Sequence, residues 1–239
     1  MVAQRLGFDY IDTGAFYRCV TYVALSKGID PSDSQSTKRI SDLAEQAKIG
    51  LDTIFSRGQD AMIDDSQKPA TLMLPTTRVF LNSTDVSSEI RTSRVSHYVS
   101  AVAAIGPVRE AILQKVRKMG ATDDDQGIAR KPGLVMDGRD IGTVVLPQAD
   151  LKVFLVADSR VRAERRLQEL IRNGADPTRD NLDVKAVQED LEKRDEQDRT
   201  RTVSPLKKAA DAMELDTSNL TLEDQVEVIV NEVKRRRGA

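Results

Sequence analysis

A short apolar run that leads directly into charged residues constrains the fold of this chain most strongly. Residues 134–136 are Leu-Val-Met, and the sequence Asp-Gly-Arg-Asp follows at 137–140. A short apolar run bounded by glycine is typical of a buried strand. Because α/β proteins bind ligands beyond the carboxyl ends of their strands, we expect two carboxylates and a guanidinium to border a crevice. The alternative is an ordinary strand exit with solvated charges.

Apolar strand-like segments alternate with amphipathic ones, which indicates an α/β fold with a parallel sheet. The pattern predicts strands at 8–12, 133–137, 151–157 and 211–216. It predicts helices at 15–27, 37–48, 83–118 (broken near residues 106–107), 159–172 and 183–199, and a last helix after a capping-box-like start at 221–224. One face of that last helix should carry Leu222, Val226, Ile229, Val230 and Val233. Residues 50–82 predict short antiparallel strands that form an insert, and residues 120–132 predict a polar loop.

The composition excludes several classes of function. The 239 residues include 36 basic and 38 acidic side chains, so nothing favours bulk attraction to nucleic acid or to an anionic membrane. There is neither an apolar run of ~20 residues that would span a bilayer nor a signal-peptide core, and we expect a cytoplasmic protein. Cys19 and His97 are each the only residue of their type, which excludes an intrachain disulfide and argues against a histidine or cysteine metal site.

Without histidine or cysteine sites, chemistry must depend on other polar side chains, and two places in the sequence offer them. Arg18 lies one turn into the helix that follows the strand-turn sequence Asp-Thr-Gly at 12–14, where a guanidinium can hold a phosphate. Ser100 and Arg109 offer donors for the ring nitrogen and carbonyl of a pyrimidine. Asp140 offers an acceptor for the exocyclic amine that cytosine has and uracil lacks. The alternatives are a common strand-turn-helix junction and a solvated helix arginine at 109.

Arginines are concentrated between residues 160 and 201, where there are nine of them. Arginine is the preferred side chain for phosphate recognition, and an arginine-rich helix pair suits a lid that closes over a polyphosphate. Carboxylates are interleaved with these arginines, so an exposed, salt-bridged surface is the alternative.

From about Phe8 to the C-terminus, these segments closely resemble the cytidylate kinases, bacterial nucleoside monophosphate kinases specific for CMP and dCMP. The resemblance lies in five motifs that keep the order and spacing of the family: Asp12-Thr13-Gly14-Ala15-Phe16-Tyr17-Arg18, Ser87-Ser88-Glu89-Ile90-Arg91-Thr92, Ser100-Ala101-Val102-Ala103-Ala104 with Pro107-Val108-Arg109, Asp137 to Val145, and Arg194 to Arg201.

The resemblance implies a role for each matching residue. Ser100, Arg109 and Asp140 would recognise the cytosine, and Arg18, Arg139 and Arg201 would hold the monophosphate. Arg194 and Asp198 would contact the sugar hydroxyls, and Thr13 would lie near the nucleotide. The lid over the donor phosphates would include Arg162, Arg165 and Arg166. Of these residues, Arg139, Arg162 and Arg201 would be catalytic, and none would be a metal ligand.

The resemblance also implies a P-loop-kinase-like parallel sheet flanked by helices over residues 1–239. The monophosphate-binding region at 50–118 would contain the antiparallel insert, and the lid region would cover 159–201. Such kinases need a phosphate-cradling loop that ends in Gly-Lys-[Ser/Thr] or Gly-Lys-Gly, yet none of the 13 glycines precedes a lysine. Residues 1–7 resemble the end of the helix that follows this loop. We therefore expect an N-terminally truncated chain that lacks the first strand and the phosphate loop.

The expected reaction is transfer of a phosphoryl group from ATP to CMP or dCMP, with Mg²⁺ as cofactor and charge neutralisation by arginines. The alternative is a CMP-binding module without kinase activity, because the phosphate loop is absent from the sequence. The expected partners are CMP, dCMP and ATP, with no nucleic acid and no membrane, and the family resemblance suggests a monomer.

Overall fold

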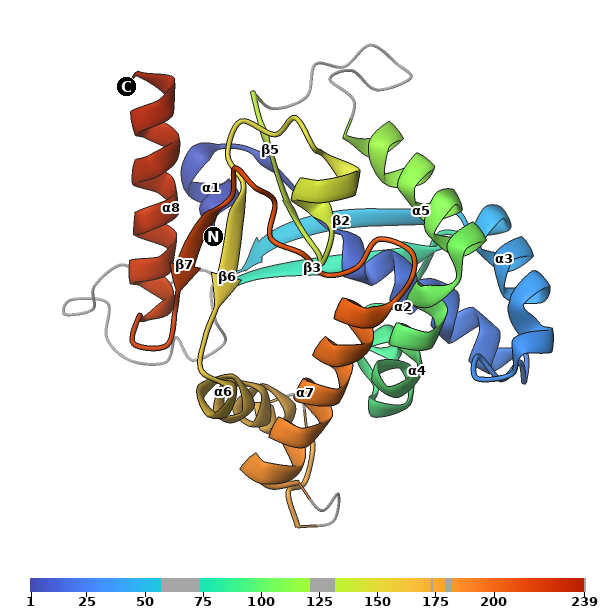
Figure 1. Ribbon diagram of the computed structural model, residues 1–239. Helices are drawn as coiled ribbons and strands as arrows, with labels where there is room; N and C mark the ends of the chain where they lie inside the picture. Colours follow the sequence, from blue (N-terminus) through green and yellow to red (C-terminus); the bar gives the residue numbers. More distant parts are fainter. Residues whose placement is uncertain (57–73, 121–131, 173, 179–181, 239) are drawn as a thin grey trace. The chain divides into compact units, whose positions relative to one another are not determined.

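The computed structural model describes residues 1–56, 74–120, 132–172, 174–178 and 182–238. The chain forms two compact units, Met1–Gly138 and Arg139–Ala239. Figure 1 shows the helices and strands of both units along the sequence. The predicted loop at 120–132 lies almost wholly outside the described residues.

A pair of parallel strands in the first unit confirms the strand assignment for the apolar run. β1 (Asp9–Asp12) pairs with β5 (Leu134–Asp137), with Asp9 opposite Leu134 and Asp12 opposite Asp137. The carboxyl ends of both strands therefore coincide, and each ends in an aspartate. The short helix α1 (Val2–Leu6) precedes β1, and Gly7 ends it in the left-handed conformation, with φ 67°.

Four longer helices belong to the first unit, and apart from the start of the third they lie close to where the sequence predicted them. They are α2 (Thr13–Ser26), α3 (Thr37–Gln46), α4 (Ser93–Ala104) and α5 (Gly106–Met119). The carboxylate of Asp12 accepts from the backbone N–H of Ala15, at 3.2 Å, and so caps the start of α2. α2 contacts α3, α4 and α5, and α3 also contacts α5.

The prediction that the helix begins at Ser83 is wrong, because α4 begins ten residues later. The intervening residues form the short strand β4 (Thr84–Asp85) and the 3-10 turn η2 (Glu89–Arg91). Asn82 and Ser83 have positive φ angles of 48° and 71°, which a helix excludes. The carboxylate of Asp85 accepts from the backbone N–H of Ser87 at 3.0 Å, and such local bonds compete with helix formation.

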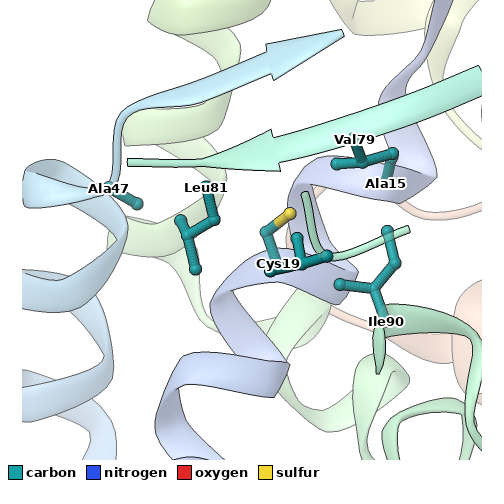
Figure 2. Close-up of a cluster of buried hydrophobic side chains, with 7 residues drawn as sticks. Ala15, Cys19, Ala47, Val79, Leu81 and Ile90 are labelled. Atoms are coloured by element: carbon teal, nitrogen blue, oxygen red, sulfur yellow. The ribbon is translucent and has the colours of Figure 1, made fainter. Parts of the chain in front are cut away.

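The predicted antiparallel insert is confirmed in its described part. β2 (Ile49–Ser56) pairs with β3 (Leu74–Leu81), and β3 pairs with β4 in a three-stranded antiparallel sheet. A buried cluster joins this sheet to α2 and η2, as Figure 2 shows for most of its members. The cluster consists of Ala15, Cys19, Ala47, Val79, Leu81, Val86 and Ile90.

The second unit contains a second pair of parallel strands and three helices. β6 (Val153–Val156) pairs with β7 (Met213–Asp216), and the helices are α6 (Ser159–Arg172), α7 (Val184–Thr200) and α8 (Leu222–Arg237). All five lie close to their predicted positions, and α6 contacts α7. Asp158 caps α6 through the N–H groups of Arg160 and Val161, and Thr221 and Asp224 form the predicted capping box of α8.

The predicted apolar face of α8 is only partly buried. Val226 and Val230 are buried, whereas Leu222 is 49% exposed. Leu222 is the first residue of the helix, a full turn before the first buried valine, so its side chain lies beyond the packed surface.

Parallel strands flanked by helices and an antiparallel sheet make this a mixed α/β fold, as the sequence predicted. Among the described residues, the parallel strands form two separate hydrogen-bonded pairs, β1 with β5 and β6 with β7. These elements do not confirm that a first strand and a phosphate loop are missing.

Candidate functional site

The carboxyl ends of β1 and β5 bring polar side chains together. The hydroxyl of Thr13 donates to the backbone carbonyl of Asp137, at 2.7 Å. Tyr10 forms a side-chain hydrogen bond with Asp137, and burial, followed by the charges of Asp137 and Asp12, raises the tyrosine pKa well above its usual range. Tyr10 therefore stays neutral and donates to the carboxylate. These bonds fix Asp137 at the strand end where the sequence predicted a ligand-binding edge.

Arg18 is held in a defined position by two neutral acceptors. Its Nη1 donates to the backbone carbonyl of Ile90, at 3.1 Å, and to the hydroxyl of Ser96, at 2.9 Å. Ile90 belongs to η2 and Ser96 to α4, so two further elements orient this arginine of α2. The helix position predicted for Arg18 is confirmed, and its role towards a phosphate stays a prediction.

Arg109 is also held within the first unit. Its Nη1 donates to the carbonyl of Ala103, at 3.0 Å, and its guanidinium lies over the ring of Tyr17, 5.3 Å from the ring centre. These contacts argue against the alternative of a freely solvated helix arginine. Ser100 lies on α4, one turn before Ala103.

Asp140 belongs to the second unit, at the start of a short π-helical turn over residues 141–145. Its carbonyl accepts from the N–H of Val144, at 2.9 Å. Ser100 and Arg109 lie in the first unit, so recognition of cytosine by these three residues together stays a prediction.

Three predicted site residues meet in the second unit. Asp198 accepts from Nη1 of Arg201 at 3.0 Å through one carboxylate oxygen, and from Nε of Arg139 at 3.2 Å through the other. The Asp198 and Arg201 side chains are only 9% and 5% exposed, whereas that of Arg139 is 52% exposed. We call these three residues the Asp198 cluster. Only its Arg139 member reaches substantially into solvent.

Three further candidate arginines of the second unit have different partners, and Arg166 forms an ion pair with Glu169, at 2.8 Å. Arg162 forms an ion pair with Asp195, at 2.6 Å. Arg165 instead donates to the carbonyls of Thr217 and Leu220, at 2.6 and 3.2 Å, and so holds the loop after β7. The assignment of the arginine-rich helices to a lid stays a prediction.

Charges of both signs surround Arg194. Burial is the main cause that lowers the pKa of Arg194; the charges of Arg139 and Arg166 lower it further, whereas those of Asp190 and Asp198 raise it. In the described part of the chain, the Nε atoms of Arg162 and Arg194 are buried without a hydrogen-bond partner. Buried cationic donors of this kind favour an anionic ligand.

The described residues include no group of three or more histidine, cysteine, aspartate or glutamate side chains suited to a metal ion. His97 stacks edge-on against Tyr98, and Cys19 lies in the buried cluster. None of the described helices has the length and apolar character needed to cross a membrane.

Sequence reasoning gave no role to several residues that contact candidate site residues, among them Ser96, Tyr17 and Asp195. Ser96 precedes Ser100 by four residues, so both lie on one face of α4. That spacing was the available signal, but it does not indicate which arginine the hydroxyl meets.

Comparisons with known proteins agree with the motifs. The profile of the cytidylate kinase family matches residues 1–235. The cytidylate kinase of Chlorobaculum tepidum is 39% identical over 98% of this chain and 86% of its own length. That of Limosilactobacillus fermentum is 40% identical over 98% and 88%, and that of Bacillus subtilis 36% identical over 99% and 89%. These alignments do not support the expected N-terminal truncation. The chain belongs to the cytidylate kinase family.

Proposed function

We propose that this protein transfers the γ-phosphoryl group of ATP to CMP or dCMP. Its relatives in Chlorobaculum tepidum and Bacillus subtilis are named cytidylate kinases. The observation that carries the proposal is the arginine concentration in the second unit, where the Asp198 cluster adjoins the charge of Arg194. Phosphoryl transfer depends on positioning and charge neutralisation, which such arginines supply.

The chain's own residues divide the work of binding the acceptor nucleotide. Arg18, Arg139 and Arg201 hold the monophosphate, because each presents a forked set of donors. Ser100, Arg109 and Asp140 recognise the cytosine edge. Both carboxylate oxygens of Asp198 already accept from arginines, so its contact with a sugar hydroxyl uses the remaining lone pairs. Arg194 contacts the sugar from the same helix, α7.

The donor side needs a divalent cation, and Mg²⁺ is the one we propose. Mg²⁺ usually binds through one or two protein carboxylates together with substrate phosphates. Asp12 and Asp137, opposite each other at the ends of β1 and β5, fit that pattern. When bound, the ion neutralises charge on the phosphates of ATP. Arg162 adds positive charge on the donor side. We further propose a cytoplasmic monomer.

A coupled kinase assay and calorimetry test the proposal. Phosphorylation of CMP and dCMP, with UMP at least about tenfold slower because it lacks the exocyclic amine, would support it. Arg139→Ala should weaken CMP binding without unfolding the protein, since the side chain is 52% exposed. Arg160→Ala, at an exposed surface ion pair with Glu164, is the matched control and should leave binding unchanged.

The outcomes separate the proposal from its alternative. A folded protein that does not bind CMP would overturn the proposal. CMP binding without turnover would favour the CMP-binding module, an alternative that the comparisons do not favour.

A further inference from the structure

We propose that Ser96 is a positioning residue that orients the guanidinium of Arg18 towards the phosphate of the acceptor nucleotide. The inference rests on the proposed function, in which Arg18 holds the monophosphate. No motif of the sequence assigned a role to Ser96. The observation that indicates a role for Ser96 is its hydroxyl, which accepts a hydrogen bond from Nη1 of Arg18, at 2.9 Å.

The two bonds at Nη1 orient the guanidinium of Arg18. Nη1 carries two N–H groups, and their acceptors include the hydroxyl of Ser96 and the carbonyl of Ile90. Losing one acceptor lets the side chain rotate, and an arginine has considerable rotamer freedom to regain.

Both acceptors are themselves fixed by packing in the first unit. Ile90 is 1% exposed and lies in the buried cluster next to Cys19, which follows Arg18 on α2 (Figure 2). Ser96 lies on α4 between the buried residues Val95 and Val99. Two separate elements therefore hold one nitrogen of Arg18, which defines its direction more tightly than either contact alone.

The chemistry of the acceptors also suits a phosphate-binding role. A hydroxyl and a backbone carbonyl are neutral, so these two bonds orient the guanidinium without cancelling its charge. In the Asp198 cluster, by contrast, a carboxylate holds both arginines and offsets part of their charge. The Ser96 contact thus preserves the electrostatic attraction that a phosphate needs.

The test compares three variants by calorimetric titration with CMP and with cytidine, which lacks the phosphate. Ser96→Ala should raise the Kd of CMP about fivefold, which corresponds to the net contribution of one typical hydrogen bond, and leave the Kd of cytidine unchanged. Ser96→Thr keeps a hydroxyl and should restore most of the affinity. Ser93→Ala changes an exposed serine on the same helix and should behave as the unchanged protein.

A double-mutant cycle with Arg18→Lys distinguishes a direct partnership from a general effect on folding. Adding Ser96→Ala to Arg18→Lys should cause little further loss of CMP affinity. The proposal is overturned if Ser96→Ala binds CMP normally, if CMP and cytidine weaken equally, or if the two substitutions are additive. Failure of the unchanged, folded protein to bind CMP would instead refute the proposed function, and the inference with it.

Discussion

Replacing Asp198 with asparagine should destabilise the second unit, and the structure sets the magnitude. The carboxylate meets Arg201 on one side and Arg139 on the other. Asparagine has nearly the same shape, but it can accept from one of these arginines only by turning its NH₂ group towards the other. The substitution therefore removes one favourable contact, adds an unfavourable one and removes the negative charge that Asp198 presents to the buried guanidinium of Arg201.

The two halves of the Asp198 cluster contribute unequally. The Arg201 pair is buried, at 5% and 9% exposed, and removing one partner of a buried pair costs about 3–5 kcal/mol. The Arg139 side chain is 52% exposed, so solvent screening limits the contribution of its ion pair with Asp198 to about 0–1 kcal/mol of stability. We expect Asp198→Asn to lower the free energy of unfolding by about 3 kcal/mol. For a protein of this size that lowers Tm by about 6–12 °C.

The assay is thermal unfolding followed by circular dichroism, with Arg139→Ala as the control. Because Arg139 is exposed, its removal should lower Tm by about 4 °C or less. A Tm for Asp198→Asn within about 2 °C of the unchanged protein would refute the reasoning. So would an equal loss in both variants, since burial would then not decide the strength of the pair.

Two further predictions concern the interior of the first unit. A methyl group at Gly133 would lie 2.5 Å from the buried ring of Phe8, so Gly133→Ala should lower the free energy of unfolding, measured in urea, by about 1–3 kcal/mol. Gly50→Ala is the control, because its methyl group would make an ordinary 3.7 Å contact, and it should not lower this free energy. Equal losses in both variants would contradict the prediction. Burial raises the pKa of the Cys19 thiol to about 12, so the reactive thiolate is scarce until the pH approaches that value. Iodoacetamide at about pH 8 should modify Cys19 only after unfolding, and fast labelling of the folded protein would disagree.

Local interactions explain why so much of the fold was predictable from the sequence. Asp12, Asp183 and Thr221 each cap a helix through a backbone N–H only a few residues away, so a short window of sequence contains the whole signal. The prediction of a helix from Ser83 failed for a related reason. Helical propensity there competes with the turn at Asn82 and Ser83 and with the local bonds of Asp85.

The sequence proposes the candidate site as a set of residues and not as a set of contacts. The motifs single out Arg18, Arg139, Asp198 and Arg201, whose roles stay predictions, and with the comparisons they indicate the family. They did not show that Asp198 pairs with two arginines or that a hydroxyl on α4 orients Arg18. Arg139 and Asp198 are 59 residues apart in the sequence, and Arg18 and Ser96 are 78 apart.

The sequence by itself therefore predicted most of the strands and helices, the capping box of α8 and the resemblance to a kinase family, because periodicity, capping and motif spacing act over short distances along the chain. Only the tertiary structure decided which guanidinium meets which acceptor. It ties Arg165 to the loop after β7 and buries Arg201 against Asp198, while Arg139 stays exposed. These pairings depend on packing between distant segments, which fixes both the partner of each charge and its access to solvent.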